Sequence, residues 1–302
     1  MRPASTNTWS ASSVVSLPRK RQLNISGTEL EQTVLKAVFF DLDDTLLHDD
    51  LSISDYTARV LQKLHEQGTY IVPASGRARL SMKPYVDQLA CVKAYISCNG
   101  AEIWDGVSGR LLFQELFPAE TVSAIAAFAE DNHCYAHVYE GNRFYFNRRS
   151  VYAERYAASS GLEGCYVGNL CSFVHEPRNK ILMIDEEPRI AALYEQARTL
   201  FDGKASVTCS KPWFLEFNPP AATKGNALRT LSGMLGFDPA ESIAFGDSLN
   251  DLSMLCAAGT GVAVANGWEE LKRLSDCICG SNNQDGPAHF LNDHFLHGEV
   301  VS

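Results

Sequence analysis

Two carboxylates stand directly after a short apolar run near the start of the chain, in the sequence KAVFFDLDDT of residues 36–45. The run AVFF predicts a strand that is buried on both faces, as in a parallel sheet. If the extended geometry continues past the strand, Asp41 and Asp43 point to the same side beyond its carboxyl end, and Asp44 points elsewhere. Close carboxylates repel each other unless a cation lies between them or one of them holds a proton. Both arrangements are useful in catalysis.

A calcium-binding loop and an ordinary acidic turn are the alternatives for this stretch. A calcium loop that begins at Asp41 needs Gly at its sixth position and Glu at its twelfth, but these positions hold Leu46 and Ser52. The calcium loop is therefore excluded. An acidic turn after a strand fits the stretch by itself, and only residues later in the chain argue against it.

Polar residues also follow two further predicted strands, TYIVPA at 69–74 and SIAF at 242–245. A helical pattern over 51–68 connects the first two strands, and a right-handed βαβ crossover puts their carboxyl ends at the same edge of one sheet. Ser75 is therefore expected to face Asp41, although a helix N-cap explains this serine about as well. The polar residues that follow these two strands are Ser75, Gly76 and Arg77, and Asp247, Asn250 and Asp251.

A lysine adds a positive charge to this set. The pattern predicts a helix over 224–235, with Thr223 as its N-cap, Gly236 as its stop and Lys224 in its first turn. Considered alone, a solvated lysine at a helix end is the simpler interpretation. Beside the carboxylates of the strand ends, Lys224 becomes a candidate catalytic residue.

The order of the predicted elements gives the fold class. Strands and helices alternate at both ends of the chain, which is typical of an α/β protein with an open, doubly wound parallel sheet. Between them, short aromatic segments alternate with helical stretches, which indicates a separate unit inserted into the sheet domain. We expect a disordered leader at 1–33, a Rossmann-like core made of 34–107 and 214–297, and an inserted α/β cap at 108–213.

Four motifs in order resemble those of the haloacid dehalogenase superfamily of phosphohydrolases, and the match runs from about Lys36 to Phe290. The insert resembles the cap of the Cof-type, class IIB branch, as do Asn99-Gly100-Ala101, Glu216-Phe217 and the NNQDG of 282–286. Trp268 departs from that branch, which usually has a small residue there; it either covers a helix start or reshapes a wall of the cleft. The four motifs are DLDDT (41–45), SGR (75–77), TKG (223–225) and GDSLND (246–251).

The resemblance implies a role for each matching position. Asp41 would be the nucleophile that forms an aspartyl-phosphate, and Asp43 would act as general acid and then as general base. Ser75 and Lys224 would hold the phosphoryl oxygens. The remaining implied sites are a Mg²⁺ site made by Asp41, the Asp43 backbone carbonyl and Asp247 with Asp251 in support, and substrate contacts at Gly76, Arg77, Asn218 and Asn250.

Composition limits the partners. A net charge of −10 argues against a general nucleic-acid or anionic-membrane binder, and no apolar run is long enough to span a membrane. The nine cysteines form no CxxC pair, which predicts free thiols in a reducing compartment and so a cytoplasmic location. Residues 1–28 hold no acidic residue and are rich in Ser and Thr; a transit peptide or a misassigned start also fits, but we favour the disordered leader.

The function implied is a Mg²⁺-dependent phosphatase that acts on a small phosphorylated metabolite. A sugar phosphate is the first expectation for the substrate, and pyridoxal phosphate or a flavin nucleotide is the second. A phosphomutase uses the same aspartyl-phosphate and is the nearest alternative, because water access under the cap decides between the two. A binding protein on an inactive hydrolase fold is a remote alternative, since Asp41, Asp43, Lys224 and Asp247 are all present.

Overall fold

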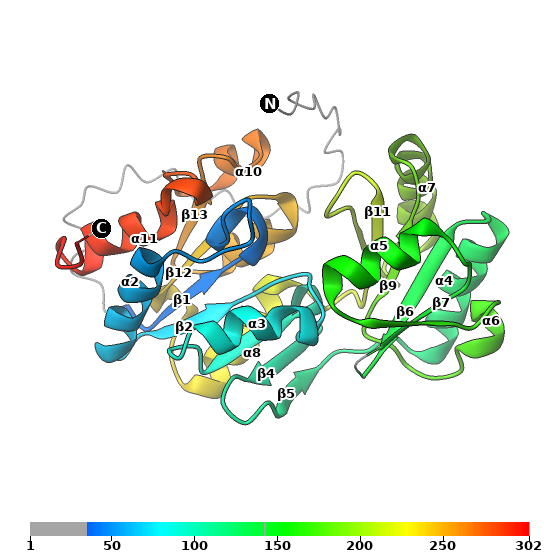
Figure 1. Cartoon of the computed structure of the whole chain (residues 1–302), viewed down its shortest axis with the longest axis horizontal. Coiled ribbons are helices and arrows are strands. Elements are labelled where there is room, and N and C mark those ends of the chain that lie inside the picture. Colours follow the sequence, from blue (N-terminus) through cyan, green and yellow to red (C-terminus); the bar gives the residue numbers. More distant parts are fainter. Residues whose placement is uncertain (1–34, 142, 302) are drawn as a thin grey trace.

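The computed structural model of the chain describes residues 35–141 and 143–301, so the expected leader at 1–33 lies outside the described residues. Two bodies lie next to each other (Figure 1): one contains both ends of the described chain, and the other is formed by its middle third. Within the described part, none of the helices has both the length and the apolar character that a membrane crossing requires.

The first body is built on a parallel sheet. Its strand order is β14-β13-β12-β1-β2, so β1 and β12 are hydrogen-bonded neighbours although about two hundred residues separate them (Figure 1). Isolated parallel bridges from β2 continue toward β3. The strands are β1 (Ala37–Phe40), β2 (Tyr70–Pro73), β3 (Ala94–Ser97), β12 (Ser242–Gly246), β13 (Thr260–Val264) and β14 (Cys277–Cys279).

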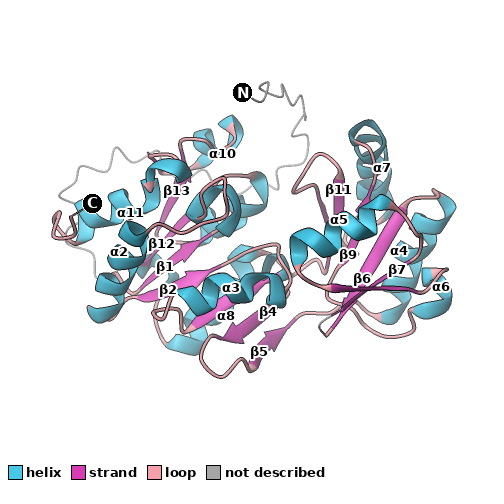
Figure 2. Cartoon of the chain, in the orientation of Figure 1, coloured by secondary structure: helices cyan, strands magenta, loops and turns pink. Residues whose placement is uncertain are grey.

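Helices cover both faces of this sheet (Figure 2). Val38 and Phe40 of β1 pack into one apolar cluster with α2, α3 and α11, whereas Ala37 and Phe39 pack into another with α8, α9 and α10. Alternate residues of a strand face opposite sides, so a strand buried on both sides must be apolar throughout. The doubly wound α/β fold is confirmed. The helices are α2 (Asp55–Glu66), α3 (Arg79–Gln88), α8 (Lys224–Leu235), α9 (Leu252–Ala257), α10 (Glu269–Leu274) and α11 (Gly286–Phe295).

The second body is a mixed sheet with helices. Its strand order is β10-β11-β9-β6-β7-β8, and only the β7–β8 pair is parallel. A separate apolar cluster fills the space between this sheet and α4, α6 and α7. The elements are α4 (Ala119–Asp131), β6 (Tyr135–Glu140), β7 (Arg143–Phe146), α5 (Val151–Ser160), β8 (Glu163–Tyr166), α6 (Leu170–Phe173), β9 (Ile181–Ile184), α7 (Glu187–Leu200), β10 (Ser206–Thr208) and β11 (Phe214–Asn218).

Strand pairing differs from our expected division at both edges of the cap. β4 (Glu102–Asp105) and β5 (Leu111–Gln114) form an antiparallel sheet with β3, so 111–114 lies with the core rather than with the cap. β11, which we expected in the core, pairs antiparallel with β9 and belongs to the cap sheet. An apolar run shows that a strand forms but not which distant strand pairs with it. We propose that the two connections between the bodies lie near 115–118 and 219–222.

A carboxylate near the C-terminus ties the loop after β1 to the last helix. The Oδ1 atom of Asp285 accepts hydrogen bonds from Ser54 Oγ at 2.6 Å and Thr57 Oγ1 at 2.8 Å, and it lies 3.0 Å from His48 Nε2. Burial acts to raise the pKa of Asp285, but these bonds outweigh it and leave the pKa below its ordinary value. The late NNQDG sequence therefore has a structural role in the described fold.

Asp285→Asn is expected to lower the free energy of unfolding by about 1–3 kcal/mol, because hydroxyl donors lose a charged acceptor. A carboxylate with a lowered pKa stabilises the fold above its unfolded pKa and loses that effect as the pH falls through the folded pKa. Urea unfolding at pH 7 should therefore separate wild type from variant, and the difference should shrink below about pH 4. Asp293→Asn on the exposed side of α11 is the control, and an equal loss in both would contradict the assigned role.

Candidate active site

The polar residues that follow β1, β2 and β12 meet at one edge of the core sheet, as the strand order requires. They line a cavity of about 180 Å³ that lies between the core and the cap. The core supplies Asp41, Asp43, Asp44, Ser75, Gly76, Arg77, Ser81, Asp247, Ser248 and Asn250, and the cap supplies Tyr156, Ser159, Ser160, Lys180, Leu182, Ser210, Lys211, Phe214 and Glu216. The cap therefore covers the carboxylates that the core provides.

A buried lysine joins two of the carboxylates. Lys224 at the start of α8 is fully buried, and its Nζ atom lies 2.5 Å from Asp41 Oδ1 and 2.5 Å from Asp251 Oδ1. Burial acts to lower the pKa of Lys224, but the charges of Asp251 and Asp41 outweigh it and raise the pKa above its ordinary value. The lysine is therefore held as a cation, and it fixes one oxygen of each carboxylate.

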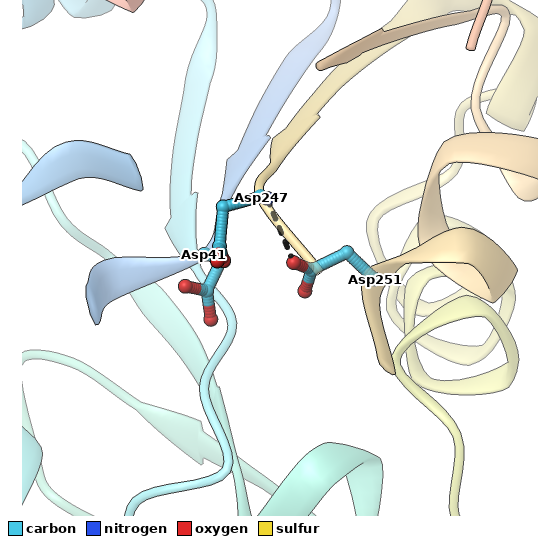
Figure 3. Close-up of side chains that lie close together, drawn as sticks. All are labelled: Asp41, Asp247 and Asp251. Atoms are coloured by element: carbon cyan, nitrogen blue, oxygen red, sulfur yellow. Dashed lines mark hydrogen bonds between the residues drawn. The ribbon is translucent and has the colours of Figure 1, made fainter. Parts of the chain in front are cut away.

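Three carboxylates form a cluster that is suited to a divalent cation. Asp41, Asp247 and Asp251 each place one oxygen within 4.8 Å of the others, and Figure 3 shows the three side chains directed toward one another. Burial raises the pKa of Asp41 to about 8, with the charges of Asp251 and Asp43 adding to the effect and Lys224 opposing it. Burial and the charges of Asp251, Asp41 and Asp44 raise the pKa of Asp247 well above its ordinary value. Since all donors are oxygens and their charges are only partly balanced, the residues fit Mg²⁺.

Asp251 has a supporting position in this cluster. Its Oδ2 atom accepts hydrogen bonds from the backbone N–H of Asp247 at 3.0 Å and of Ser248 at 3.2 Å. The turn is tight, because a Cβ atom at Gly246 would lie 2.5 Å from Asp251 Cβ. Both oxygens of Asp251 therefore already have protein partners, and Asp41 and Asp247 are the carboxylates with more freedom to bind a cation.

Asp43 has a different partner. Arg77 donates from Nε to Asp43 Oδ2 at 2.7 Å and from Nη2 to Oδ1 at 2.6 Å, which is the two-pronged pairing that a guanidinium favours. Burial acts to raise the pKa of Asp43, but the hydrogen bonds and charge of Arg77 outweigh it and lower the pKa. We expected Arg77 to contact substrate directly, but in this structure it is engaged with Asp43. Asp44 also lines the cavity rather than pointing elsewhere, since its φ of 61° turns the chain back.

The other expected residues are placed as follows. Ser75 is buried at the cavity wall, and its Oγ atom accepts from the backbone N–H of Arg77 at 3.1 Å. Asn250 lines the cavity and donates to Asn99 Oδ1 at 3.4 Å. Asn218 is not a lining residue: it is buried at the end of β11, and its Oδ1 atom has no hydrogen-bond partner among the described residues. The structure therefore brings together the expected residues other than Asn218.

Comparison with known proteins identifies the family. The model of the haloacid dehalogenase-like hydrolases matches residues 38–291, which include every strand of the core sheet except the first residue of β1. The chain belongs to the haloacid dehalogenase-like hydrolases. It is a phosphoric monoester hydrolase, in agreement with the phosphatases among its relatives.

Relatives match over nearly their whole length. The 5-amino-6-(5-phospho-D-ribitylamino)uracil phosphatase YitU of Bacillus subtilis is 28% identical over 85% of this chain and 97% of its own. A haloacid dehalogenase-like hydrolase from Bacteroides thetaiotaomicron has a solved structure with a TM-score of 0.78 at 29% identity, covering 86% of this chain and 99% of its own. A subclass IIB sugar phosphatase shares the fold with a TM-score of 0.75 at 22% identity, covering 88% of this chain and 100% of its own.

In this hydrolase the cap contributes charged groups that motif reasoning did not assign. Lys180, just before β9, donates to Gly76 O at 3.0 Å and pairs with Glu216 of β11 at 3.1 Å. Glu216 also accepts from Asn99 of the core at 2.8 Å. Because a Cβ atom at Gly100 would lie 2.3 Å from Thr223 O, the glycine allows the turn of Asn99 to approach α8 closely. These contacts link the cap to the loop that carries Arg77.

Three further residues remain to be placed relative to the cavity: Tyr156, Lys211 and Trp268. Tyr156 of α5 and Lys211 before β11 line the cavity, but no sequence signal distinguishes them from ordinary cap residues. Trp268 lies immediately before α10 and donates its backbone N–H to Asp247 O at 2.7 Å. It lies at the start of α10 and is not among the lining residues of the cavity.

Proposed function

We propose that the protein is a cytoplasmic, Mg²⁺-dependent phosphatase that hydrolyses a small phosphorylated metabolite through an aspartyl-phosphate. The observation that carries this proposal is the pairing of buried Asp41 with Lys224 at one side of a capped cavity, while Arg77 holds Asp43 nearby. A carboxylate, a proton carrier and fixed cations around one small cavity are what phosphoryl transfer needs. The nine cysteines, which are free thiols, support the cytoplasmic location.

The nucleophile in this proposal is Asp41. Lys224 holds its Oδ1 atom, so the carboxylate has a fixed orientation toward the cavity. Attack of a carboxylate oxygen on phosphorus forms the aspartyl-phosphate and releases the alcohol, and water then breaks the new bond. Mg²⁺ bound by Asp41, the Asp43 carbonyl and Asp247 would neutralise charge on the phosphoryl oxygens.

Asp43 is the proton carrier. It would donate a proton to the departing alcohol oxygen and later accept one from the attacking water, which requires that it change protonation state during the cycle. Because the pairing with Arg77 favours the ionised form, Asp43 would have to take up a proton from solvent before it acts as the acid. Ser75 and Lys224 would stabilise the phosphoryl oxygens as charge spreads over them. Several groups must contribute together, because enzymes accelerate phosphate monoester hydrolysis by up to ~10^21-fold and one carboxylate cannot supply this acceleration alone.

The substrate is a small ester in this proposal, because the cap covers the cavity and leaves no room for a polymeric nucleic acid or a phosphoprotein. A sugar phosphate is the first candidate. A phosphorylated ring compound such as pyridoxal phosphate or a flavin nucleotide is the second candidate. The Bacillus subtilis relative favours this second candidate, because the substrate in its name is a phosphorylated uracil derivative. A phosphomutase remains the alternative for the same chemistry.

Phosphate release from sugar phosphates, pyridoxal phosphate, flavin mononucleotide and p-nitrophenyl phosphate should require Mg²⁺ and fall to the uncatalysed level in EDTA. The reason is that Lys224 balances only part of the charge of Asp41, Asp247 and Asp251, and a bound divalent cation would balance the rest. Restoring Mg²⁺ in excess over EDTA is the control and should restore the rate. Release that is unaffected by EDTA would contradict the metal assignment. Product in which the phosphate has moved to another hydroxyl, without phosphate release, would establish the mutase instead.

A further inference from the structure

The catalytic cavity is small compared with a typical small-molecule site. Its volume of about 180 Å³ compares with roughly 300–1,000 Å³ for typical small-molecule sites. A small ester such as a pentose phosphate fills such a space, so a larger leaving group must extend beyond it. A larger hollow of about 740 Å³ adjoins the cavity on its cap side. The two share Tyr156, Ser159, Lys211 and Phe214 as lining residues, so the hollow lies directly beside the site of chemistry.

Aromatic side chains dominate the apolar lining of this hollow, which we name the cap groove. Trp213 is 47% exposed there. A ligand that covers it would remove a large apolar area from water, which favours binding. The Phe214 ring packs edge-to-face with Trp213 with centroids 6.3 Å apart, so Phe214 can cover at most one face of the indole. The cap groove is lined by Val151, Tyr152, Arg155, Tyr156, Ser159, Ile184, Asp185, Glu186, Glu187, Lys211, Trp213 and Phe214.

The charges of the cap groove nearly cancel. Arg155 and Lys211 are exposed cations, and Glu186 and Glu187 are exposed carboxylates. Asp185 adds no free charge, because it pairs with Arg189 at 3.2 Å. If the substrate carried a second phosphate group in this groove, that group would meet as many carboxylates as cations, so its charge would add little to the binding free energy. An uncharged group with acceptor atoms fits better. Arg155 and Lys211 can donate hydrogen bonds to it, and the groove as a whole has almost no net charge.

We propose that the cap groove is the leaving-group subsite and that it takes a flat, uncharged heterocyclic ring with carbonyl or ring-nitrogen acceptors. The ring stacks on Trp213, and Lys211, at the junction with the catalytic cavity, donates to its acceptors. Lys211 lines both hollows, and its Nζ atom lies 5.7 Å from the centroid of the Phe214 ring. This inference rests on the proposed phosphatase function and names the substrate class for it: a phosphate ester that carries a nitrogen heterocycle.

Uridine 5′-monophosphate and ribose 5-phosphate are a matched pair of probes, because they share the phosphorylated sugar and differ in the ring. Wild type with Mg²⁺ should show a kcat/KM about tenfold or more higher for the uridine ester, since one stacked base contributes that order of affinity. Trp213→Ala should remove most of this ratio and leave ribose 5-phosphate within about twofold of wild type. Tyr166→Ala, at another cap residue that is 47% exposed but outside the groove, should leave the ratio unchanged.

Calorimetric binding of the two esters to Asp41→Asn protein gives the same comparison without turnover. A wild-type preference for ribose 5-phosphate would overturn the subsite, as would a loss in Trp213→Ala that is equal for both esters. If wild type hydrolyses neither these esters nor acetyl phosphate, yet Asp41→Asn protein binds the uridine ester more tightly and Trp213→Ala abolishes this difference, the phosphatase proposal fails and the subsite stands. If acetyl phosphate is hydrolysed but Trp213→Ala changes neither binding nor kcat/KM, the subsite fails and the phosphatase proposal stands.

Discussion

Asp41→Asn protein is expected to release phosphate at least ~10^4 times more slowly than wild type, which is the order seen when an enzyme loses its nucleophile. The amide cannot attack phosphorus, so the covalent route is closed. Its shape is nearly that of the carboxylate, and its oxygen can still accept from Lys224, so the fold should be retained. Initial rates at saturating substrate with Mg²⁺, together with an unfolding curve, separate loss of chemistry from loss of structure.

Asp50→Asn is the matched control for this variant. Asp50 lies in the exposed loop after the same motif and hydrogen-bonds only to Ser52 among the described residues, so it undergoes the same chemical change away from the cavity. Its rate should stay within about twofold of wild type, as expected of a surface substitution. Asp41→Asn protein that is folded and retains wild-type rates would show that another group is the nucleophile.

Lys224→Met is expected to lower the free energy of unfolding by about 3–5 kcal/mol, because it leaves two buried carboxylates without their cation. Lys224 is fully buried, and its ion pairs to Asp41 and Asp251 are each 2.5 Å long. Urea unfolding without metal measures the loss. Mg²⁺ should recover part of it, since a cation bound by the folded state alone stabilises that state by mass action.

A control variant and a double variant test the cause of the stability loss in Lys224→Met. Lys83→Met breaks an ion pair to Asp87 that is about half exposed on both sides, and it should cost less than about 1 kcal/mol. Adding Asp251→Asn to Lys224→Met removes one of the stranded charges and should recover stability relative to the single variant. Equal losses for the buried and exposed lysines, or no recovery in the double variant, would contradict the assigned balance of charge.

The core was predictable because its signal is local. Each buried strand of the parallel sheet is a short apolar run, and β1, β12 and β13 are buried along their whole length. The same signal misplaced β11: the sequence FLEF fits a strand of either body, and its pairing with β9 depends on residues thirty or more positions away. Local patterns therefore found the elements, whereas the cap boundary needed pairing information that they do not contain.

The site was predictable to the extent that it follows from strand ends. Asp41, Ser75 and Asp247 had to meet because their strands are parallel neighbours or nearly so. The partner of Arg77 could not be predicted, because spacing along the chain does not say whether a guanidinium points to a carboxylate or into the cavity. Lys180 and Lys211 reach the site only through the placement of the cap, more than one hundred residues after the nucleophile.

Hydrogen bonds cross the boundary between cap and core: Asn179 donates to Glu102 at 2.5 Å, Ser81 to the Ser160 carbonyl at 2.6 Å, and Lys180 to the Gly76 carbonyl at 3.0 Å. Apolar contacts across it include those of Ala78 and Leu80 with the cap. Most of the apolar clusters are confined to one body or the other. Water can replace each of these hydrogen bonds when the boundary parts, whereas an apolar boundary would lose its stabilisation outright. The cap and the core can therefore separate reversibly at a small cost in free energy. Alcohol and phosphate can then leave while both bodies stay folded.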